Sequence, residues 1–387
     1  MRIYNISQLA GVGADFGILG NAWLDIEDGR ITAVGTGGTR GDIDARGGVV
    51  MPMFCDPHTH IIYSRPREQE FVDKIRGLSY HEIAARGGGI LNSARALAQT
   101  PEEKLFDDAL GRLSDMMAHG TGAVEIKSGY GLDTESELKM LRVAARLRDA
   151  VPIPVKITFL GAHAVPESFH GDTEAYVRHI IQDMLPAVAA QGYADYVDVF
   201  CEDGFFNADM TVRICAAAAG YGLRPRIHAA QFRLHDGIRA AVEAGAVSVD
   251  HLEIADSDDI ALLRRYATVP TVLPGASFFT APHIYAPARE MLDAGLKVAI
   301  ASDYNPGTAP SGDMRMMWTL ACTQMGLTPL EALRCATQYA ALALELPDRG
   351  TIAPGQKAAL IITAPVPDIA YIPYAYSEHW IERLIFN

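Results

Sequence analysis

The sequence predicts an α/β fold: a (β/α)8 TIM barrel with a small β-sandwich domain formed from both chain ends. Three observations predict it: eight short apolar runs, helix-like sequence in most gaps between them, and short strand-and-turn segments at the two ends. Apolar strands that alternate with helices are typical of parallel sheets covered by helices. Doubly wound sheets also alternate, but no GxGxxG or GxxxxGK[ST] motif follows the first run, which favours the barrel.

The apolar runs are the expected barrel strands. Helical segments such as 135–149 and 258–267 lie between them and carry the mixture of apolar and charged residues that a helix packed on a sheet requires. We expect the metal-dependent hydrolase barrel to occupy residues 48–349. Its strands are expected at 48–54, 122–127, 155–160, 196–201, 224–229, 246–251, 268–273 and 297–302.

The two chain ends differ from the expected barrel region in their sequence pattern. Residues 1–47 contain short strand-like pieces with turns, such as "DGRITAVG", and residues 350–387 resume this pattern with "GTIAPGQKAALIITAP". The simplest arrangement is one β-sandwich domain built from 1–47 plus 350–387, with the barrel inserted between its halves.

Composition excludes several classes of protein. The 387 residues are 49% hydrophobic and carry a formal net charge of −14, which argues against a nucleic-acid or anionic-membrane partner. The five cysteines form no CxxC pair, which favours reduced thiols. No apolar run approaches the ~20 residues that span a bilayer, and the N-terminus lacks a signal-peptide pattern. We therefore expect a cytoplasmic protein.

Two histidines end the first run. His58 and His60 are two residues apart, so in an extended chain both imidazoles face the same way. Taken alone, the pair is equally compatible with hydrogen-bonded core histidines and with half of a metal site.

Further polar residues end other runs, and their positions favour a metal site over hydrogen-bonded core histidines. His163 follows the third run, His228 and His251 end the fifth and sixth, and Asp303 follows the eighth. Active sites of such barrels lie at the carboxyl ends of the strands. Three histidines and a carboxylate suit Zn²⁺ or Fe²⁺ with an open position for water. Such a metal makes hydroxide available near neutral pH, and Asp303 could also take the proton from that water.

These residues, with the motifs around them, resemble the amidohydrolase superfamily and, within it, the imidazolonepropionase family. The matching stretches follow the family's order along the barrel: "DPHTH", "LSYHEIAARGGGI", "SGYGLD", "FLGAHA", "DHLE", "LPGA" and "DYNPGT". Among them, the combination of "SGYGLD", "FLGAHA" and "DYNPGT" is specific. The resemblance implies a β-sandwich beside the barrel and a homodimer.

The resemblance also implies roles for individual residues. One divalent metal, zinc first and iron as the alternative, would be held by His58, His60, His228 and Asp303. Asp303, His251 and Gln231 would be the catalytic residues, with His251 beside the attacked carbonyl. The substrate, a small heterocycle that bears a carboxylate, would be bound by Arg67, Tyr80, Tyr130, His163 and Asn305. Without the resemblance, structural roles are favoured for three of these residues: a surface ion pair for Arg67, loop packing for Tyr130 and the apolar face of a helix for Tyr80.

Some positions depart from the family pattern. The acidic residue common two positions after the strand-five histidine is Ala230 here, and Gln231 remains. Glutamine can hydrogen-bond a ring but cannot act as a base at neutral pH. Lys127 follows the second strand, so it is a poor candidate for the carbamylated bridge that two-metal relatives carry after the fourth strand. Cys201 and Glu202, at the end of the fourth strand, leave a second metal as a minor possibility.

The expected activity is hydrolysis of 4-imidazolone-5-propanoate to N-formimino-L-glutamate by metal-bound hydroxide. The close alternative is a desulfhydrase that converts 3-(5-oxo-2-thioxoimidazolidin-4-yl)propanoate to hydantoin-5-propanoate and sulfide, because the loss of a carboxylate at Ala230 would suit a polarisable sulfur. A nucleobase or pterin deaminase and a non-catalytic binding protein are the remaining alternatives.

Overall fold

The barrel predicted from the sequence is present. The computed structural model describes residues 1–38, 40–78, 82, 88–233, 236–280 and 283–387. Within them, an eight-stranded parallel sheet runs in sequence order from β6 to β13. Its strands are β6 (Phe54–Asp56), β7 (Thr121–Lys127), β8 (Val155–Ala162), β9 (Tyr196–Cys201), β10 (Arg224–Ala229), β11 (Ser248–His251), β12 (Val269–Val272) and β13 (Ala299–Ile300).

The barrel closes just beyond the carboxyl ends of its first and last strands. Thr59 and Tyr304 form a parallel bridge. The His60 amide donates to the Tyr304 carbonyl at 2.9 Å, and the Asp303 amide donates to the His58 carbonyl at 3.1 Å. The seam therefore runs through residues that the sequence predicts as metal ligands.

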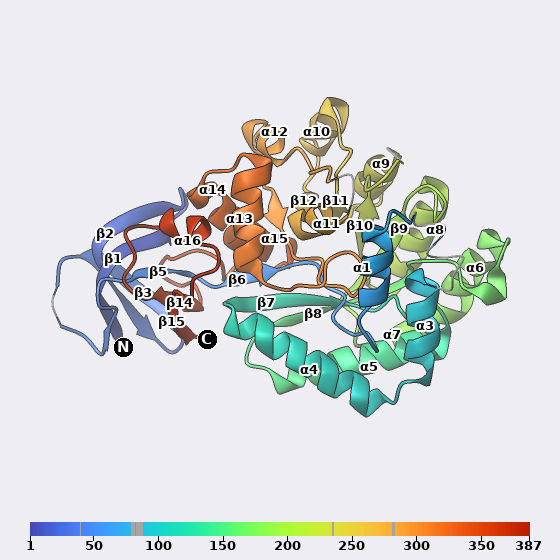
Figure 1. Ribbon diagram of the computed structural model, residues 1–387, viewed down its shortest axis with the longest axis horizontal. Helices are drawn as coiled ribbons and strands as arrows, with labels where there is room; N and C mark the ends of the chain where they lie inside the picture. Colours follow the sequence, from blue (N-terminus) through green and yellow to red (C-terminus); the bar gives the residue numbers. More distant parts are fainter. Residues whose placement is uncertain (39, 79–81, 83–87, 234–235, 281–282) are drawn as a thin grey trace.

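Helices surround the strands (Figure 1). The helix expected at 135–149 is α5, and Asp133 caps its start by accepting from the Ser136 amide at 2.9 Å. The helix expected at 258–267 is shorter and ends at Leu263. No described helix is long and apolar enough to cross a membrane. The helices of the barrel region are α1 (Glu68–Ile75), α3 (Gly89–Gln99), α4 (Glu102–Ala118), α5 (Thr134–Ala150), η1 (Glu167–Phe169), α6 (Thr173–His179), η2 (Ile180–Met184), α7 (Leu185–Gln191), α8 (Ala208–Ala219), α9 (Asp236–Glu243), α10 (Ser257–Leu263), α11 (Pro274–Phe279), α12 (Ala288–Asp293), α13 (Met314–Met325), α14 (Pro329–Arg334), η3 (Cys335–Tyr339) and α15 (Ala340–Ala343).

Both chain ends contribute to a second, mixed sheet (Figure 1). Its strands form one hydrogen-bonded path, β15-β14-β5-β1-β2-β3, and β4 pairs with β1. This sheet has an apolar core of its own, which includes Ile3, Leu24 and Leu360. Its elements are β1 (Arg2–Val12), β2 (Gly17–Glu27), β3 (Arg30–Thr36), β4 (Ile43–Asp44), β5 (Val49–Pro52), β14 (Leu360–Thr363) and β15 (Ile381–Ile385), and the short helix α16 (Tyr371–Tyr374) lies between the last two.

The first apolar run, expected as one barrel strand at 48–54, is two strands. Val49–Pro52 pairs with β1 and β14 of the end sheet, whereas Phe54–Asp56 pairs with β7 of the barrel. A continuous apolar run cannot reveal this change of partner, because every residue of both strands is buried. The division of the chain into 1–47 with 350–387 and 48–349 stays a prediction.

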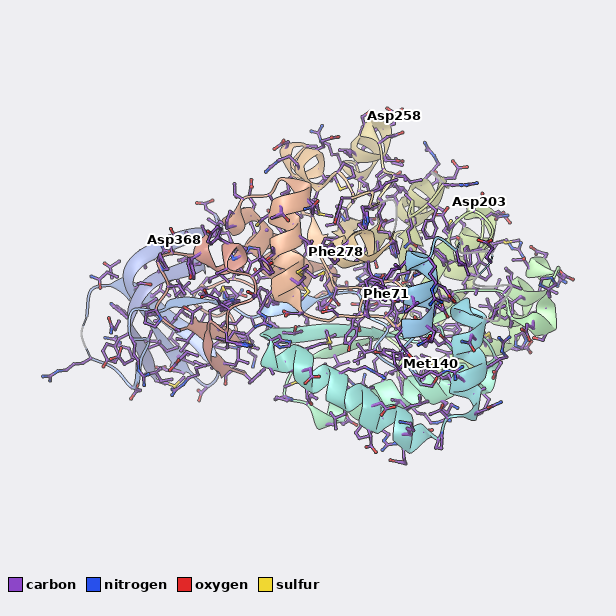
Figure 2. All side chains as sticks on the ribbon, in the orientation of Figure 1. Phe71, Met140, Asp203, Asp258, Phe278 and Asp368 are labelled. Atoms are coloured by element: carbon purple, nitrogen blue, oxygen red, sulfur yellow. The ribbon has the colours of Figure 1, made fainter. Side chains whose placement is uncertain are left out.

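The main core lies between the barrel strands and the helices, where Met140 of α5 is fully buried. Figure 2 shows the side chains on both parts of the molecule and places Asp203 and Asp258 on the outer loops and helices of the barrel. Such packing leaves little room for added atoms.

Gly48, just before β5, is the position where an added methyl group should be most harmful to the end sheet. A Cβ there would lie 2.0 Å from the Thr363 carbonyl oxygen. Gly48→Ala should lower the free energy of unfolding by about 1–3 kcal/mol or more, because a backbone shift between β5 and β14 is required. Thermal unfolding measures this. Gly111→Ala is the matched control, since a Cβ there meets no atom within 4 Å inside α4, and it should be neutral or mildly stabilising. Equal stability of the two variants would contradict this account.

Candidate active site

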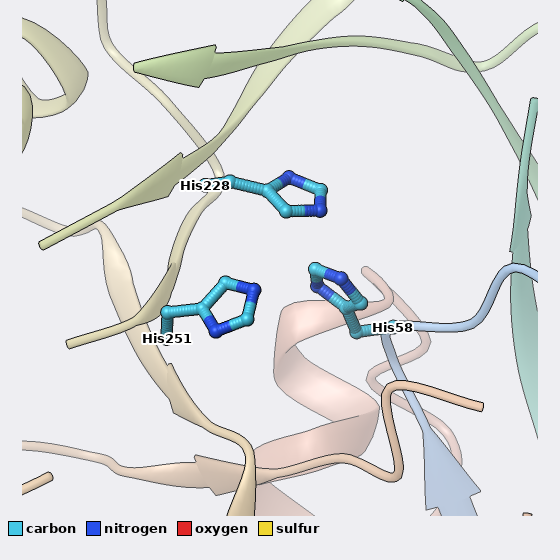
Figure 3. A group of neighbouring side chains, drawn as sticks. All are labelled: His58, His228 and His251. Carbon is cyan, nitrogen blue, oxygen red and sulfur yellow. The ribbon is translucent and has the colours of Figure 1, made fainter. Parts of the chain in front are cut away.

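The polar residues predicted at the strand ends converge at the carboxyl end of the barrel. His58 and His60 follow β6, His228 lies in β10, His251 ends β11 and Asp303 follows β13. Each is at most 3% exposed. Figure 3 shows the rings of His58, His228 and His251 turned toward one another, His58 from the segment after β6 and the other two from β10 and β11.

The distances among these side chains match a metal-binding geometry. The Nε2 atom of His60 lies 3.2 Å from Nε2 of His58 and 3.4 Å from Nε2 of His228. Oδ1 of Asp303 lies 3.6 Å from Nε2 of both His58 and His60. Tetrahedral zinc with Zn–N bonds near 2.0–2.1 Å holds its nitrogen ligands roughly 3.3 Å apart. Two groups with the spacing of metal ligands share His58: one is His58, His60 and Asp303, and the other is His58, His228 and His251.

The protonation states of His58, His60 and His228 also fit a metal site. Nδ1 of His58 lies 2.7 Å from Oδ2 of Asp250 and must donate to that carboxylate, which leaves its Nε2 without a proton. Nδ1 of His228 lies 3.0 Å from Oδ2 of Asp198, an ion-pair distance whose angle is poor for a hydrogen bond. Burial lowers the pKa of His58, His60 and His228 well below the usual value, so the rings are neutral. Neutral nitrogens beside a carboxylate suit a divalent cation.

Asp198 and Asp250 contact two of the predicted ligands, and the sequence analysis did not identify them. Each lies inside a buried strand, β9 or β11, and each carboxylate faces the far nitrogen of one predicted ligand. Such carboxylates orient metal-binding histidines. The signal was present, because an aspartate in the apolar runs "YVDVFC" and "AVSVDH" is costly to bury without a partner.

His251 has a carboxylate partner of its own. Its Nδ1 lies 3.2 Å from Oε1 of Glu253. Burial disfavours a charge on His251, but Glu253 and Asp303 outweigh that penalty and raise the pKa of His251. This ring can therefore carry a proton next to the cluster formed by the other histidines. The pKa of Asp303 is also raised, but here burial is the cause: it raises the pKa of the carboxyl to about 7, and a cation at its oxygen would lower it again.

His163 and Tyr130 line the same space as the cluster. The His163 ring stacks on His60 with centroids 5.3 Å apart, and Tyr130 lies 6.0 Å from His60 and 5.6 Å from His163. Nδ1 of His163 donates to the Gly129 carbonyl at 2.9 Å, so Nε2 is free to accept. Burial lowers the pKa of His163 to about 4, which keeps the ring neutral.

Arg67 and Asn305 lie at the seam side of the site. The guanidinium of Arg67 is paired with Glu70 at 2.5 Å, and a Cβ on Gly307 would collide with it. Asn305 is engaged by its own loop: its amide nitrogen donates to the Asp303 carbonyl at 2.7 Å, and its oxygen accepts from the amides of Gly307 and Thr308 at 2.8 Å. Asn305 thus shapes the loop that carries Asp303, and its predicted contact with substrate stays a prediction. Tyr80 lies outside the described residues.

Glu202 has a role different from the second-metal ligand considered in the sequence. Its carboxylate accepts from the amides of Gln231, Phe232 and Arg233 at 2.9–3.0 Å and so anchors the loop after β10. Among the described residues, both groups with metal-ligand spacing include His58, and neither contains Cys201 or Glu202. Gln231, predicted as catalytic, is held on this anchored loop.

Comparisons with known proteins fit this site. The model of the amidohydrolase family matches residues 49–383. The chain is 45% identical to an imidazolonepropionase of Christiangramia forsetii and 46% identical to one of Flavobacterium johnsoniae, in each case over 100% of this chain and 96% of the relative. The chain belongs to the imidazolonepropionase family of amidohydrolases. It is accordingly a hydrolase that acts on carbon–nitrogen bonds.

A solved structure also shares the fold. The 5-methylcytosine deaminase of Klebsiella pneumoniae superposes with a TM-score of 0.77 over 100% of this chain and 96% of that chain, at 19% identity. At this identity the likeness shows that the two proteins have the same architecture, and it carries no argument about substrate.

Loading the cluster with metal should stabilise the protein. At a Zn²⁺ concentration of 100 times the dissociation constant, the free energy of unfolding of the metal-stripped protein should rise by about 2.7 kcal/mol. Differential scanning fluorimetry measures the shift. His60→Ala should lose most of it, because one of four ligands is gone, whereas His379→Ala, on an exposed side chain, should keep it. A shift of equal size in both variants would exclude this cluster as the site.

Proposed function

We propose that this chain hydrolyses 4-imidazolone-5-propanoate to N-formimino-L-glutamate, with a single divalent ion, zinc first, held by His58, His60, His228 and Asp303. The observation that supports the proposal is that His60 lies at ligand spacing from His58, His228 and Asp303, with His58 equally close to Asp303. The family membership and the relatives' shared name supply the substrate. An ion bound there would acidify water and polarise the ring carbonyl.

The product identifies the bond that breaks. In N-formimino-L-glutamate the formimino carbon keeps both nitrogens, so water adds to the ring carbonyl carbon and the bond from that carbon to its ring nitrogen is cleaved. The carbonyl carbon becomes a carboxylate. Asp303 is the group placed to take a proton from the attacking water and return it to the departing nitrogen.

Other residues of the site hold the substrate and the developing charge. His251, whose pKa is raised by Glu253 against the effect of burial, can donate a hydrogen bond to the carbonyl oxygen as negative charge forms on it. Arg67 offers a planar fork suited to the propionate. Tyr130 and His163 form the wall beside His60 against which the ring can lie.

The test is a turnover assay of the metal-loaded protein with two substrates, followed by mass identification of the products. 4-Imidazolone-5-propanoate should give formimino-glutamate, and its 2-thioxo counterpart should not be converted. Sulfide and hydantoin-5-propanoate from the thioxo compound alone would overturn the proposal and would make Ala230 a determinant of a different substrate.

Asp303→Asn should lower turnover by about 10²- to 10⁴-fold, because the amide cannot accept the water proton. Steady-state kinetics at matched metal content measure this. Asp209→Asn, an aspartate with a side chain 77% exposed, is the control and should keep the wild-type rate. Near wild-type turnover of Asp303→Asn would mean that another group moves the proton.

A further inference from the structure

A layer of fully buried charges lies beneath the predicted ligands, on the strands β7, β9, β10 and β11. All of its members are 0% exposed. It contains two cations and three carboxylates: Lys127, Arg226, Glu125, Asp198 and Asp250. None of these five residues takes part directly in the proposed hydrolysis.

Lys127 is the member that joins the layer to both ligand histidines. Its Nζ atom lies 2.7 Å from Oδ2 of Asp198 and 3.7 Å from Oδ2 of Asp250. These are the same two oxygens that face Nδ1 of His228 and Nδ1 of His58. One ammonium group therefore neighbours both carboxylates that orient a ligand.

Arg226 is placed differently. Its guanidinium donates to the carbonyls of Ala343 and Pro57 at 2.7 and 2.8 Å and lies 3.1 Å from Glu125. It is 3.9 Å from Asp250, about as far as Lys127, but among the described residues the ion pair with Asp198 belongs to Lys127. It thus ties the strands together, while Lys127 lies between the two orienting carboxylates.

We propose that Lys127 is a positioning residue of the metal centre, which aligns His58 and His228 together by bridging Asp250 and Asp198. The inference rests on the proposed ligand set. It also gives Lys127 a role unrelated to a carbamylated bridge: its Nζ donates to Glu125 at 2.9 Å and to Asp198 at 2.7 Å, and a carbamate nitrogen, which has a single hydrogen, could not make both contacts.

The test is the Zn²⁺ affinity of metal-stripped protein, measured by competition with a chromophoric chelator. Lys127→Met should weaken affinity about 10- to 100-fold, the usual effect of losing an outer partner of metal ligands. Tyr176→Phe is the control for the loss of a buried hydrogen bond. Within the described part of the chain, the Tyr176 hydroxyl bonds to the carbonyls of Leu132 and Gly161 and to none of the predicted ligands, so this variant should keep the wild-type affinity. The d–d spectrum of the Co²⁺ form should change in Lys127→Met alone.

A thermodynamic cycle separates positioning from a general loss of structure. If Lys127 acts through the two carboxylates, Lys127→Met should cost much less affinity in the Asp198→Asn/Asp250→Asn background than in the wild type. An equal cost in both backgrounds would overturn the inference. Should Lys127→Met fail to fold, the two aspartate variants remain: their separate costs should be non-additive because they share one cation, and additive costs would overturn the inference.

The same experiment distinguishes this inference from the proposed function. Wild-type protein that binds no Zn²⁺ at the cluster would refute the ligand set itself. Wild-type and Lys127→Met proteins that bind Zn²⁺ equally well would leave the ligand set intact and refute only the role of Lys127.

Discussion

The compensation of charge inside the barrel is the constraint on which the site depends. Lys127, Arg226, Glu125, Asp198 and Asp250 have no access to water, and removing one partner from such a group typically costs about 3–5 kcal/mol. Apolar residues of similar volume in place of these charges would stabilise the barrel as well or better. The ionic layer instead orients two of the predicted ligands, since two of its carboxylates face the rings of His58 and His228.

The seam of the barrel links the site to the rest of the fold. His58 and His60 come from the first strand and Asp303 from beyond the last, and these segments hydrogen-bond directly. An ion held by both segments would therefore fasten the closure of the barrel as well as supply chemistry. The first barrel strand follows β5 directly in the chain, so the end sheet and the predicted metal site meet within a few residues of Met53.

The sequence was sufficient where the place of a residue in the fold follows from its position along a strand. His58, His60, His228 and Asp303 could be placed together because parallel barrel strands all end at one face. It was insufficient where function depends on the register between strands. Nothing local to Asp198 predicts that it faces His228, because β9 and β10 pair only in the folded sheet. The split of 48–54 into two strands is hidden for the same reason.

Backbone conformation explains why the site requires this scaffold. Ala230, His251, Leu252 and Asp303 all have positive φ angles, between 54° and 85°, at the ends of barrel strands. Such conformations cost roughly 1–3 kcal/mol each for residues other than glycine and persist only when their surroundings impose them. Here the imposing contacts are hydrogen bonds between neighbouring strand ends, such as the Ile254 amide to the Ala230 carbonyl at 3.0 Å. The turns aim His251 and Asp303 at the cluster, so the cohesion of the barrel offsets the strain of its active site.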